Sequence, residues 1–337
     1  MTLPLASTFK TSKGSVSQRT GFLVRVEVDG VVGWGEASPF PGLSRETMDT
    51  VQTELAGIHH QSVDLPTGLK GVHALVYKWV SSPSAAHGFG TALLDCMAQI
   101  AGVPLSRFLN KNVRREVPIS HLYTDSDALF HAVMLGTQTV KIKVGMGSVQ
   151  HDIERIRQIR DIAGPDIQLR LDANGAWSED DASHMISNIQ EFNVCCIEDP
   201  VHAENLDAMA RLRGRGIDIA ADEALYSPTA LQEVIDRQAA DVVVVKPMRV
   251  GTPLTALAMI ALANDAGLDS FVTTTMDSAV GRMTALHIAA AAPTSGLRAC
   301  GLNTGQWLDS DVAKMPDMTG SHINGPEQPG LGLTVSP

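Results

Sequence analysis

The sequence predicts an α/β fold, namely a TIM-type (β/α)7β barrel with an α+β capping domain. Short apolar runs recur through the middle of the 337-residue chain, with room for one helix in each gap. An alternating apolar pattern precedes them, and charged residues stand where several of the later runs end. Strands that regularly alternate with helices are typical of parallel barrels, whereas simple alternation is typical of antiparallel sheet.

The capping domain is predicted over residues 1–115. Phe22–Val28 alternates between apolar and polar side chains, Asp29-Gly30 is a hairpin-turn dipeptide, and residues 31–35 return as a second strand. These features predict an antiparallel hairpin at the start of a small α+β domain.

Two helices are predicted in the same domain. Ser44 is a candidate N-cap for a helix that begins near Arg45, because its hydroxyl can accept a backbone N–H of the first turn. Residues 85–100 form a longer apolar helix. The proline-containing segment 304–337 lacks the strand and helix pattern, and we predict that it returns to the capping domain.

The barrel domain is predicted over residues 116–303. Eight candidate strands have gaps of roughly 20–30 residues, which suits one helix per gap. The last one is the weakest because it contains Arg298. The strands are predicted over 117–120, 140–144, 168–172, 194–198, 217–222, 241–246, 271–275 and 297–300.

Composition excludes several classes of function. The chain has 26 basic and 37 acidic residues and a net charge of -11, which argues against nucleic acid as a partner. No apolar stretch approaches the roughly 20 residues of a membrane span, and the first residues lack a signal-peptide pattern. The four cysteines have neither metal-site nor disulfide spacing. We therefore expect a cytoplasmic protein with reduced thiols and a small-molecule partner.

Charged residues mark the ends of five predicted strands. Strands three, four and five end in Asp172, Glu198 and Asp222, and strand six ends in Lys246. Strand two carries Lys141 and Lys143, whose side chains point to one face because they are two residues apart. Taken singly, an acid at such a position is often a helix N-cap and a lysine a solvated charge. An outward lysine pair would place Val140, Ile142 and Val144 in the barrel.

The joint pattern favours a catalytic site. In a barrel of this kind the C-terminal ends of the strands meet at one mouth, where active sites lie. Three carboxylates there would repel one another without a cation, and an oxygen-only set suits a hard ion such as Mg²⁺. Lysines on strands two and six would face each other across this metal.

These residues resemble the enolase superfamily, in its muconate-lactonizing subgroup. Lys141-Ile142-Lys143 matches the KxK motif of that subgroup, and Lys246-Pro247 its sixth-strand lysine. The resemblance covers nearly the whole chain. The three metal-ligand segments of the subgroup match Asp172-Ala173-Asn174, Glu198-Asp199-Pro200 and Asp222-Glu223.

Within the subgroup, the chain is most similar to the o-succinylbenzoate synthases of menaquinone biosynthesis. Residues 33–44 and 169–174 carry this likeness, and 300–303 lack the acids expected there in dipeptide epimerases and muconate cycloisomerases. The implied activity is a lyase reaction, the Mg²⁺-dependent syn β-elimination of water from a hydroxycyclohexadiene carboxylate. A racemase, epimerase or cycloisomerase of the same superfamily is the alternative. A non-catalytic ligand-binding barrel is a second alternative, although its ligand set would be expected to be broken.

The resemblance also implies residue roles. Asp172, Glu198 and Asp222 would hold Mg²⁺, Lys143 would be the base, Lys246 would stay protonated opposite it, and Lys141 would contact the substrate carboxylate. Thr273, Thr274, Gly301 and Phe40 are candidates for substrate binding, although the threonines also suit an ordinary strand. Loops near residues 10–20 and 40–44 are predicted to cover the barrel mouth.

Overall fold

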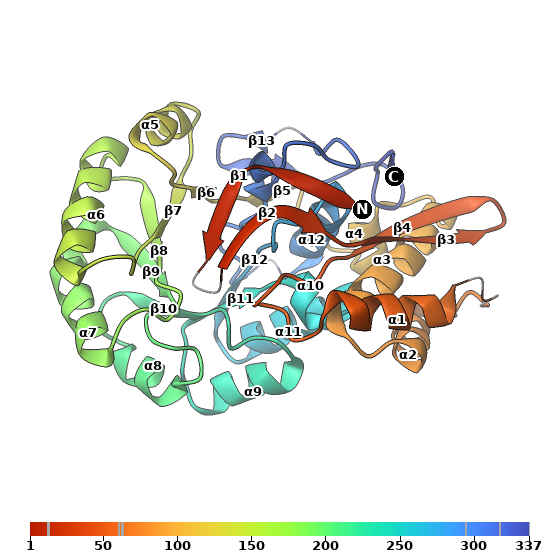
Figure 1. Ribbon diagram of the computed structural model, residues 1–337, viewed down its shortest axis with the longest axis horizontal. Coiled ribbons are helices and arrows are strands. Elements are labelled where there is room, and N and C mark those ends of the chain that lie inside the picture. Colours follow the sequence, from red (N-terminus) through yellow and green to blue (C-terminus); the bar gives the residue numbers. More distant parts are fainter. Residues whose placement is uncertain (12–13, 60, 62–63, 294, 317, 337) are drawn as a thin grey trace.

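A seven-stranded parallel sheet, curled into a barrel, is the centre of the molecule (Figure 1). The computed structural model describes residues 1–336 except 12–13, 60, 62–63, 294 and 317. The strands follow one another in chain order, as the predicted barrel requires. They are β6 (His121–Leu122), β7 (Thr139–Lys143), β8 (Gln168–Asp172), β9 (Val194–Glu198), β10 (Asp218–Ala221), β11 (Val242–Val245) and β12 (Asp269–Val272).

Residues 297–301 close the barrel between its last and first strands. Arg298 N donates to Ser270 O at 2.8 Å, and Cys300 N donates to Pro118 O at 2.7 Å. These residues form isolated bridges rather than a continuous strand, with Ser270 and Thr273 on one side and Ile119 on the other. The predicted (β/α)7β topology is confirmed, and its weakest predicted strand is reduced to these bridges.

Helices cover the outside of the curled sheet (Figure 1). Several begin at the serine or threonine caps that the sequence offers, as when Ser148 Oγ accepts His151 N and Ser227 Oγ accepts Ala230 N. The helices are α5 (Ser126–Met134), α6 (Val149–Ala163), α7 (Glu179–Asn188), η1 (Gln190–Phe192), α8 (Leu206–Leu212), α9 (Pro228–Asp236), α10 (Pro247–Val250), α11 (Pro253–Asp265) and α12 (Ala279–Ala291). Most of the helices follow a strand end at the mouth, whereas η1 lies between α7 and the start of β9.

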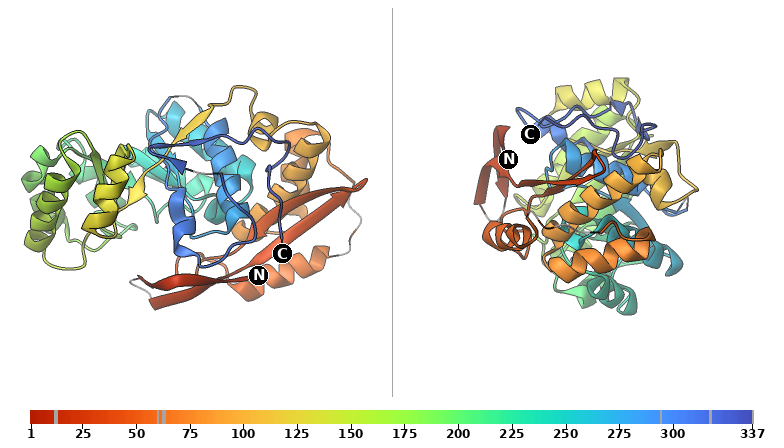
Figure 2. Two further views of the ribbon diagram at one scale, coloured as in Figure 1. Left: turned by 90° about the horizontal axis from the view of Figure 1, so that it is seen from above. Right: turned by 90° about the vertical axis from the view of Figure 1, so that its right-hand side faces the viewer.

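The first part of the chain forms a separate antiparallel and helical layer (Figures 1 and 2). In Figure 1 its hairpin (residues 22–37) and its helices (residues 48–100) lie on the right, away from α5–α8, and its first two strands cross the middle of the view. Its β3–β4 hairpin packs on α3, and glycine allows close approach: a Cβ at Gly35 would lie 1.9 Å from Gly88 O. The elements are β1 (Thr2–Thr11), β2 (Gly14–Thr20), β3 (Phe22–Val28), β4 (Val31–Ala37), α1 (Met48–Ile58), α2 (Gly68–Trp79), α3 (Pro83–Ile100) and α4 (Leu105–Leu109).

The structure corrects two local predictions in the capping layer. The helix expected to start near Arg45 begins at Met48, because Thr47 rather than Ser44 accepts a first-turn amide, that of Thr50. Ser44 Oγ instead accepts Phe40 N within a turn. The covering loop expected near residues 10–20 is largely strand, since β1 and β2 pair antiparallel.

Two barrel strands also differ from prediction. Only Val117 and Pro118 of the first predicted strand, 117–120, lie in a strand, β5 (Glu116–Pro118), and the first barrel strand, β6, begins after it at His121. β5 pairs antiparallel with β14 (His322–Asn324) instead of joining the barrel, which leaves β6 to pair with β7. The seventh strand ends at Val272, so Thr273 to Thr275 follow it at the mouth.

The C-terminal segment contacts both layers. η2 (Asn303–Trp307) leads to Leu308, which bridges to Leu5, and β13 (Met318–Thr319) pairs with β14. Leu105 N donates to Gly330 O at 2.8 Å. The predicted boundaries at 115/116 and 303/304 stay predictions. None of the helices described is long and apolar enough to cross a membrane.

Candidate active site

The predicted lysines and carboxylates meet at the C-terminal ends of the strands. Lys141 and Lys143 are partly exposed, whereas Val140 and Ile142, which alternate with them, are buried. The lysine side chains of β7 therefore point into the barrel mouth, and the apolar ones pack toward the helices. This is the orientation that the catalytic interpretation needs and the opposite of an outward lysine pair.

Lys141 bridges two of the carboxylates. Its Nζ lies 2.6 Å from Glu198 Oε2 and 2.8 Å from Asp172 Oδ2. Lys143 Nζ lies 2.5 Å from the same Asp172 oxygen and 2.7 Å from Asn174 Oδ1. β7, β8 and β9 are neighbours in the sheet, so their strand ends bring these groups together.

The second half of the cluster lies on β10 and β11. Lys246 Nζ lies 2.6 Å from Asp222 Oδ2, and both residues directly follow their strands. Arg249, in the short helix after Lys246, brings its Nη1 to 3.9 Å from Asp222 Oδ1. The predicted residues thus form two groups of ion pairs, one around Asp172 and Glu198 and one around Asp222, with Lys143 in β7 and Lys246 just after β11.

Burial and charge act in opposition on these groups. Burial favours the neutral form of Asp172, but Lys141 and Lys143 outweigh it and hold its pKa below the ordinary value. The pKa of Asp222 is likewise below its ordinary value: burial would raise it, but the charge of Lys246 opposes that effect. For Glu198 burial prevails, and its pKa is raised even though Lys141 opposes this. Burial would lower the pKa of Lys141, but Asp172 and Glu198 raise it.

Two buried carboxylate oxygens lack a hydrogen-bond partner in the described part of the chain, namely Glu198 Oε1 and Asp222 Oδ1. Buried polar atoms are normally paired, so these two suit an additional cation. In this arrangement no three acidic, histidine or cysteine side chains among the described residues converge closely enough to hold a metal ion. Lys141 Nζ stands between two of the carboxylates instead.

Asp199 supports Asp222 in a way that the sequence pattern did not reveal. Its carboxylate accepts Asp222 N at 2.9 Å and Glu223 N at 2.8 Å. The side chain is 1% exposed, and burial, followed by the charge of Asp222, raises its pKa well above the ordinary value. Asp199 therefore fixes the backbone from which Asp222 projects.

Asp199→Ala is expected to loosen this turn. Two buried N–H groups would lose their acceptor, which costs about 1–3 kcal/mol for each group left unpaired. We expect a lower free energy of unfolding in urea together with weaker Mg²⁺ binding by calorimetry. The exposed Asp207→Ala serves as the control. Unchanged stability and Mg²⁺ affinity in Asp199→Ala would contradict this role.

Arg170 is a second residue that the pattern missed. It lies in β8, is 1% exposed, and its guanidinium carbon is 3.7 Å from the ring centroid of Phe271. Nη2 donates to Ala299 O, and Nε lies 3.9 Å from Glu198 Oε1. The guanidinium group of Arg170 thus lies inside the barrel next to Glu198. A single arginine within a predicted strand gives no sequence signal that it supports a site.

The candidate substrate-binding residues gather after β12. Thr273 Oγ1 donates to Gly301 O at 3.0 Å, and a Cβ at Gly301 would lie 2.4 Å from that hydroxyl. Thr274 Oγ1 lies 2.7 Å from Thr304 Oγ1. Phe40 is buried, with the guanidinium carbon of Arg19 at 4.9 Å from its ring centroid. Thr273 and Gly301 are therefore hydrogen-bonded to each other, and their role in binding substrate stays a prediction.

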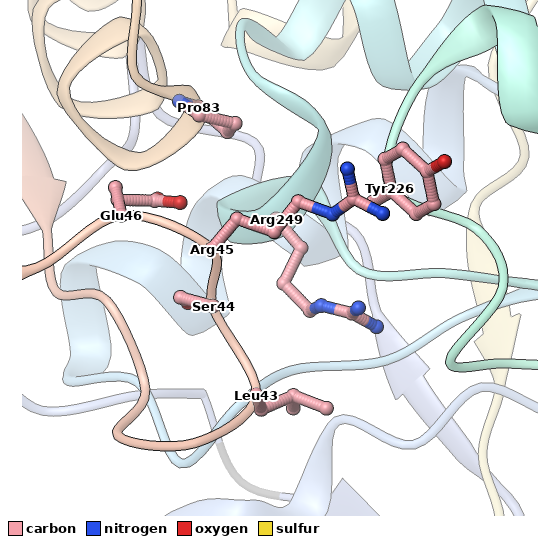
Figure 3. Close-up of a pocket in the computed structure, with 7 residues that line it drawn as sticks. All are labelled: Leu43, Ser44, Arg45, Glu46, Pro83, Tyr226 and Arg249. Atoms are coloured by element: carbon pink, nitrogen blue, oxygen red, sulfur yellow. The ribbon is translucent and has the colours of Figure 1, made fainter.

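A small pocket lies between the barrel and the capping loop, which is the segment 38–47 between β4 and α1 (Figure 3). The guanidinium carbon of Arg45 lies 3.3 Å from the ring centroid of Tyr226, which follows Asp222 in the chain. The loop predicted near residues 40–44 thus reaches the barrel beside Arg249. The lining residues are Leu43, Ser44, Arg45, Glu46, Pro83, Tyr226 and Arg249.

A buried acid pair lies where the capping layer meets α12. Asp277 accepts Thr275 N and Thr275 Oγ1, and Glu36 accepts Ser278 N. Burial raises the pKa of Asp277 to about 6 from an ordinary value of 3.8, the charge of Glu36 adding to it, while Thr275 and Arg19 oppose the rise. Asp277 therefore keeps its proton in the native state to a higher pH than in the unfolded chain.

This difference predicts a pH-dependent stability. Between about pH 4 and pH 6 the unfolded chain releases the Asp277 proton first, so the free energy of unfolding falls as pH rises, by roughly 2–3 kcal/mol. Asp277→Asn removes this titration and should be stabilised relative to wild type above pH 6. Urea unfolding of both proteins at pH 4, 5, 6 and 7 measures the difference. A stability difference that does not change with pH would refute it.

The fold and this arrangement define a capped (β/α) barrel with alternating carboxylates and lysines at its mouth. Residues 127–337 match the family described as "Enolase C-terminal domain-like", and residues 1–96 match "MenC, N-terminal domain". The chain belongs to the enolase superfamily, whose members are enzymes. The predicted superfamily is thereby confirmed.

Curated relatives and solved structures agree. The L-Ala-D/L-Glu epimerase of Bacillus subtilis is 29% identical over 98% of this chain and 93% of its own. Muconate cycloisomerase 1 of Acinetobacter baylyi is 29% identical over 85% of this chain and 81% of its own. A dipeptide epimerase of Enterococcus faecalis, solved with Mg and the dipeptide L-Leu-L-Tyr, superposes with a TM-score of 0.90 at 26% identity, covering 99% and 97% of the two chains.

Proposed function

We propose that this enzyme uses Mg²⁺ and a lysine base to remove the proton next to a substrate carboxylate. The further proposal is a lyase reaction, the dehydration of a hydroxycyclohexadiene carboxylate to o-succinylbenzoate in menaquinone biosynthesis, in the cytoplasm. The single observation that supports the proton abstraction best is the placement of Lys143 in β7 and Lys246 just after β11, each beside a candidate metal ligand.

Two observations favour the dehydration. Residues 1–96 match the "MenC, N-terminal domain" family, and residues 33–44 carry the resemblance to o-succinylbenzoate synthases. At the end of the eighth strand segment, Thr273 Oγ1 donates to Gly301 O, and residues 300–303 lack the acids expected there in dipeptide epimerases and muconate cycloisomerases. The site therefore offers no carboxylate there for a dipeptide amine.

Asp172, Glu198 and Asp222 would hold Mg²⁺. The partnerless oxygens of Glu198 and Asp222 fit this assignment, because hard cations take oxygen ligands. Mg²⁺ bound there would supply Lewis-acid stabilisation of the negative charge that develops on the substrate carboxylate. Lys141 and Lys246, which neutralise these carboxylates in the structure, would then be available to the substrate.

The lysines perform the proton chemistry in this proposal. Lys143 takes the proton α to the carboxylate. The C–H electron pair first delocalises onto the carboxylate and then forms a ring double bond as the hydroxyl leaves. Lys141 contacts the carboxylate, and Lys246 stays protonated on the opposite side, where it stabilises the delocalised charge. The C–O bond of the hydroxyl then breaks with its electron pair. Lys143 returns its proton to that oxygen, so water leaves and the ring becomes aromatic.

Incubation with the hydroxycyclohexadiene substrate and Mg²⁺ tests the proposal. The appearance of the aromatic product in the ultraviolet spectrum would support it. Absence of product with Mg²⁺ present would refute the dehydration and leave the superfamily assignment untouched.

An epimerase or racemase is the second candidate, favoured by the similarity to the L-Ala-D/L-Glu epimerase over nearly the whole chain. Such a reaction uses Lys143 and Lys246 as two bases on opposite faces. Dipeptides and N-succinyl amino acids in deuterated water test this candidate by NMR. Exchange from both stereoisomers would support it, and no exchange from either would exclude it.

A further inference from the structure

Arg19, in β2, is buried at the contact between the capping layer and the barrel. Its side chain is 2% exposed, and burial lowers its pKa. Within the described part of the chain it forms no ion pair closer than 4 Å with a carboxylate. A buried guanidinium is costly unless all its donors are used. Its burial must therefore be explained by the hydrogen bonds that the guanidinium group donates.

All three nitrogens of Arg19 donate to backbone carbonyls. Nη2 donates to Ser38 O at 2.7 Å and Nη1 to Pro39 O at 3.3 Å, both in the capping loop. Nε donates to Met276 O at 3.2 Å, in the loop between β12 and α12 of the barrel. One side chain thus holds two backbone segments that are more than 200 residues apart.

Glu36, a second residue of the capping layer, also holds the barrel loop that Arg19 contacts. Glu36 accepts Ser278 Oγ at 2.5 Å and Gly281 N at 2.8 Å, and so caps α12 from the other layer. Met276 has a φ of 59°, in the left-handed region that a side chain disfavours. A loop in such a conformation needs outside contacts to keep its shape.

Both segments border the candidate active site. The loop after β12 begins with Thr273 and Thr274 at the mouth. The capping loop contacts the segment after Lys246, since Ser38 N lies 3.3 Å from Met248 Sδ. Arg19 therefore sets the spacing between the segments that follow strands six and seven of the barrel.

We propose that Arg19 is a positioning residue for the reaction, because its guanidinium holds the loop after β12 and the capping loop in the arrangement that binds substrate. The kinetic part of this inference rests on the proposed function. Lysine cannot replace it, since one ammonium group cannot reach three divergent carbonyls as the planar guanidinium does.

Arg19→Lys tests the proposal against a matched control, Arg160→Lys. Arg160 also donates to backbone carbonyls, those of Ile167 and Phe192. These residues precede β8 and β9, respectively, at the opposite end of the barrel. With Mg²⁺ and the hydroxycyclohexadiene substrate, Arg19→Lys should raise KM about tenfold or more, with kcat changed less, because misplaced binding groups weaken substrate capture. Arg160→Lys should lower stability and leave KM unchanged.

Hydrogen exchange supplies a readout that needs neither substrate nor Mg²⁺. In Arg19→Lys the amides of residues 275–281 should exchange about tenfold faster than in wild type, whereas Arg160→Lys should leave this peptide unchanged. If Arg19→Met folds, it should show the same pattern.

Equal KM and equal exchange at 275–281 in Arg19→Lys and wild type would overturn the proposal. A lower melting temperature with unchanged KM and unchanged exchange at 275–281 would assign Arg19 a purely structural role, and this result would also overturn the proposal. If wild type fails to dehydrate the substrate, the proposed function fails alone, because the exchange measurement still decides whether Arg19 holds the loop.

Discussion

Lys143→Ala is expected to abolish turnover. Lys143 Nζ lies 2.5 Å from Asp172 Oδ2 and 2.7 Å from Asn174 Oδ1, so it is held at the mouth beside a candidate metal ligand. Lys141, the other amine on this face of β7, is paired with Glu198 and Asp172 and in the proposed mechanism contacts the substrate carboxylate instead of taking its α-proton. Loss of a general base costs about 10⁴-fold at the upper end of its usual contribution. Product formation in a stopped assay at saturating Mg²⁺ measures the effect.

The control for this variant is Lys70→Ala, which removes an exposed lysine of α2 and should leave turnover unchanged. Lys143→Arg separates charge from basicity, because arginine keeps the ion pair with Asp172 but does not release a proton at neutral pH. It should be as inactive as Lys143→Ala. Exchange of the substrate α-proton in deuterated water at the wild-type rate in Lys143→Ala would exclude Lys143 as the base.

Asp222→Asn is expected to reduce Mg²⁺ affinity by about 100-fold or more and to reduce turnover with it. The substitution keeps the size of the side chain but removes the negative charge, and a hard cation binds a neutral amide much more weakly than a carboxylate. The same change leaves Lys246 without its ion-pair partner at 2.6 Å. Calorimetric titration of the metal-free protein with Mg²⁺ measures the affinity independently of activity.

Asp241→Asn is the matched control for Asp222→Asn. Asp241 stands at the opposite end of the barrel, where it pairs with Arg213 and accepts Ile219 N. This variant should lose some stability and keep its Mg²⁺ affinity. Near-normal Mg²⁺ binding and turnover in Asp222→Asn, with an unchanged far-ultraviolet spectrum, would remove Asp222 from the metal site.

The sequence by itself determined the barrel, the alternation along β7 and the charged strand ends. Strand alternation is a local property with a period of two residues, so Lys141 and Lys143 had to share a face. Parallel strands in chain order bring their C-terminal ends to one mouth, so Asp172, Glu198 and Asp222 had to lie near one another. Neither inference requires knowledge of any partner distant in the chain.

Only the tertiary structure decided the contacts that support this site. Arg19 meets Met276 across 257 residues of sequence, and Glu36 meets Ser278 across 242. Asp199 is a polar residue one position from a predicted ligand, and nothing local shows that it accepts the amide of Asp222. A buried polar group can be retained wherever the fold supplies its partner. Because that partner is chosen by packing between distant segments, no local pattern predicts it.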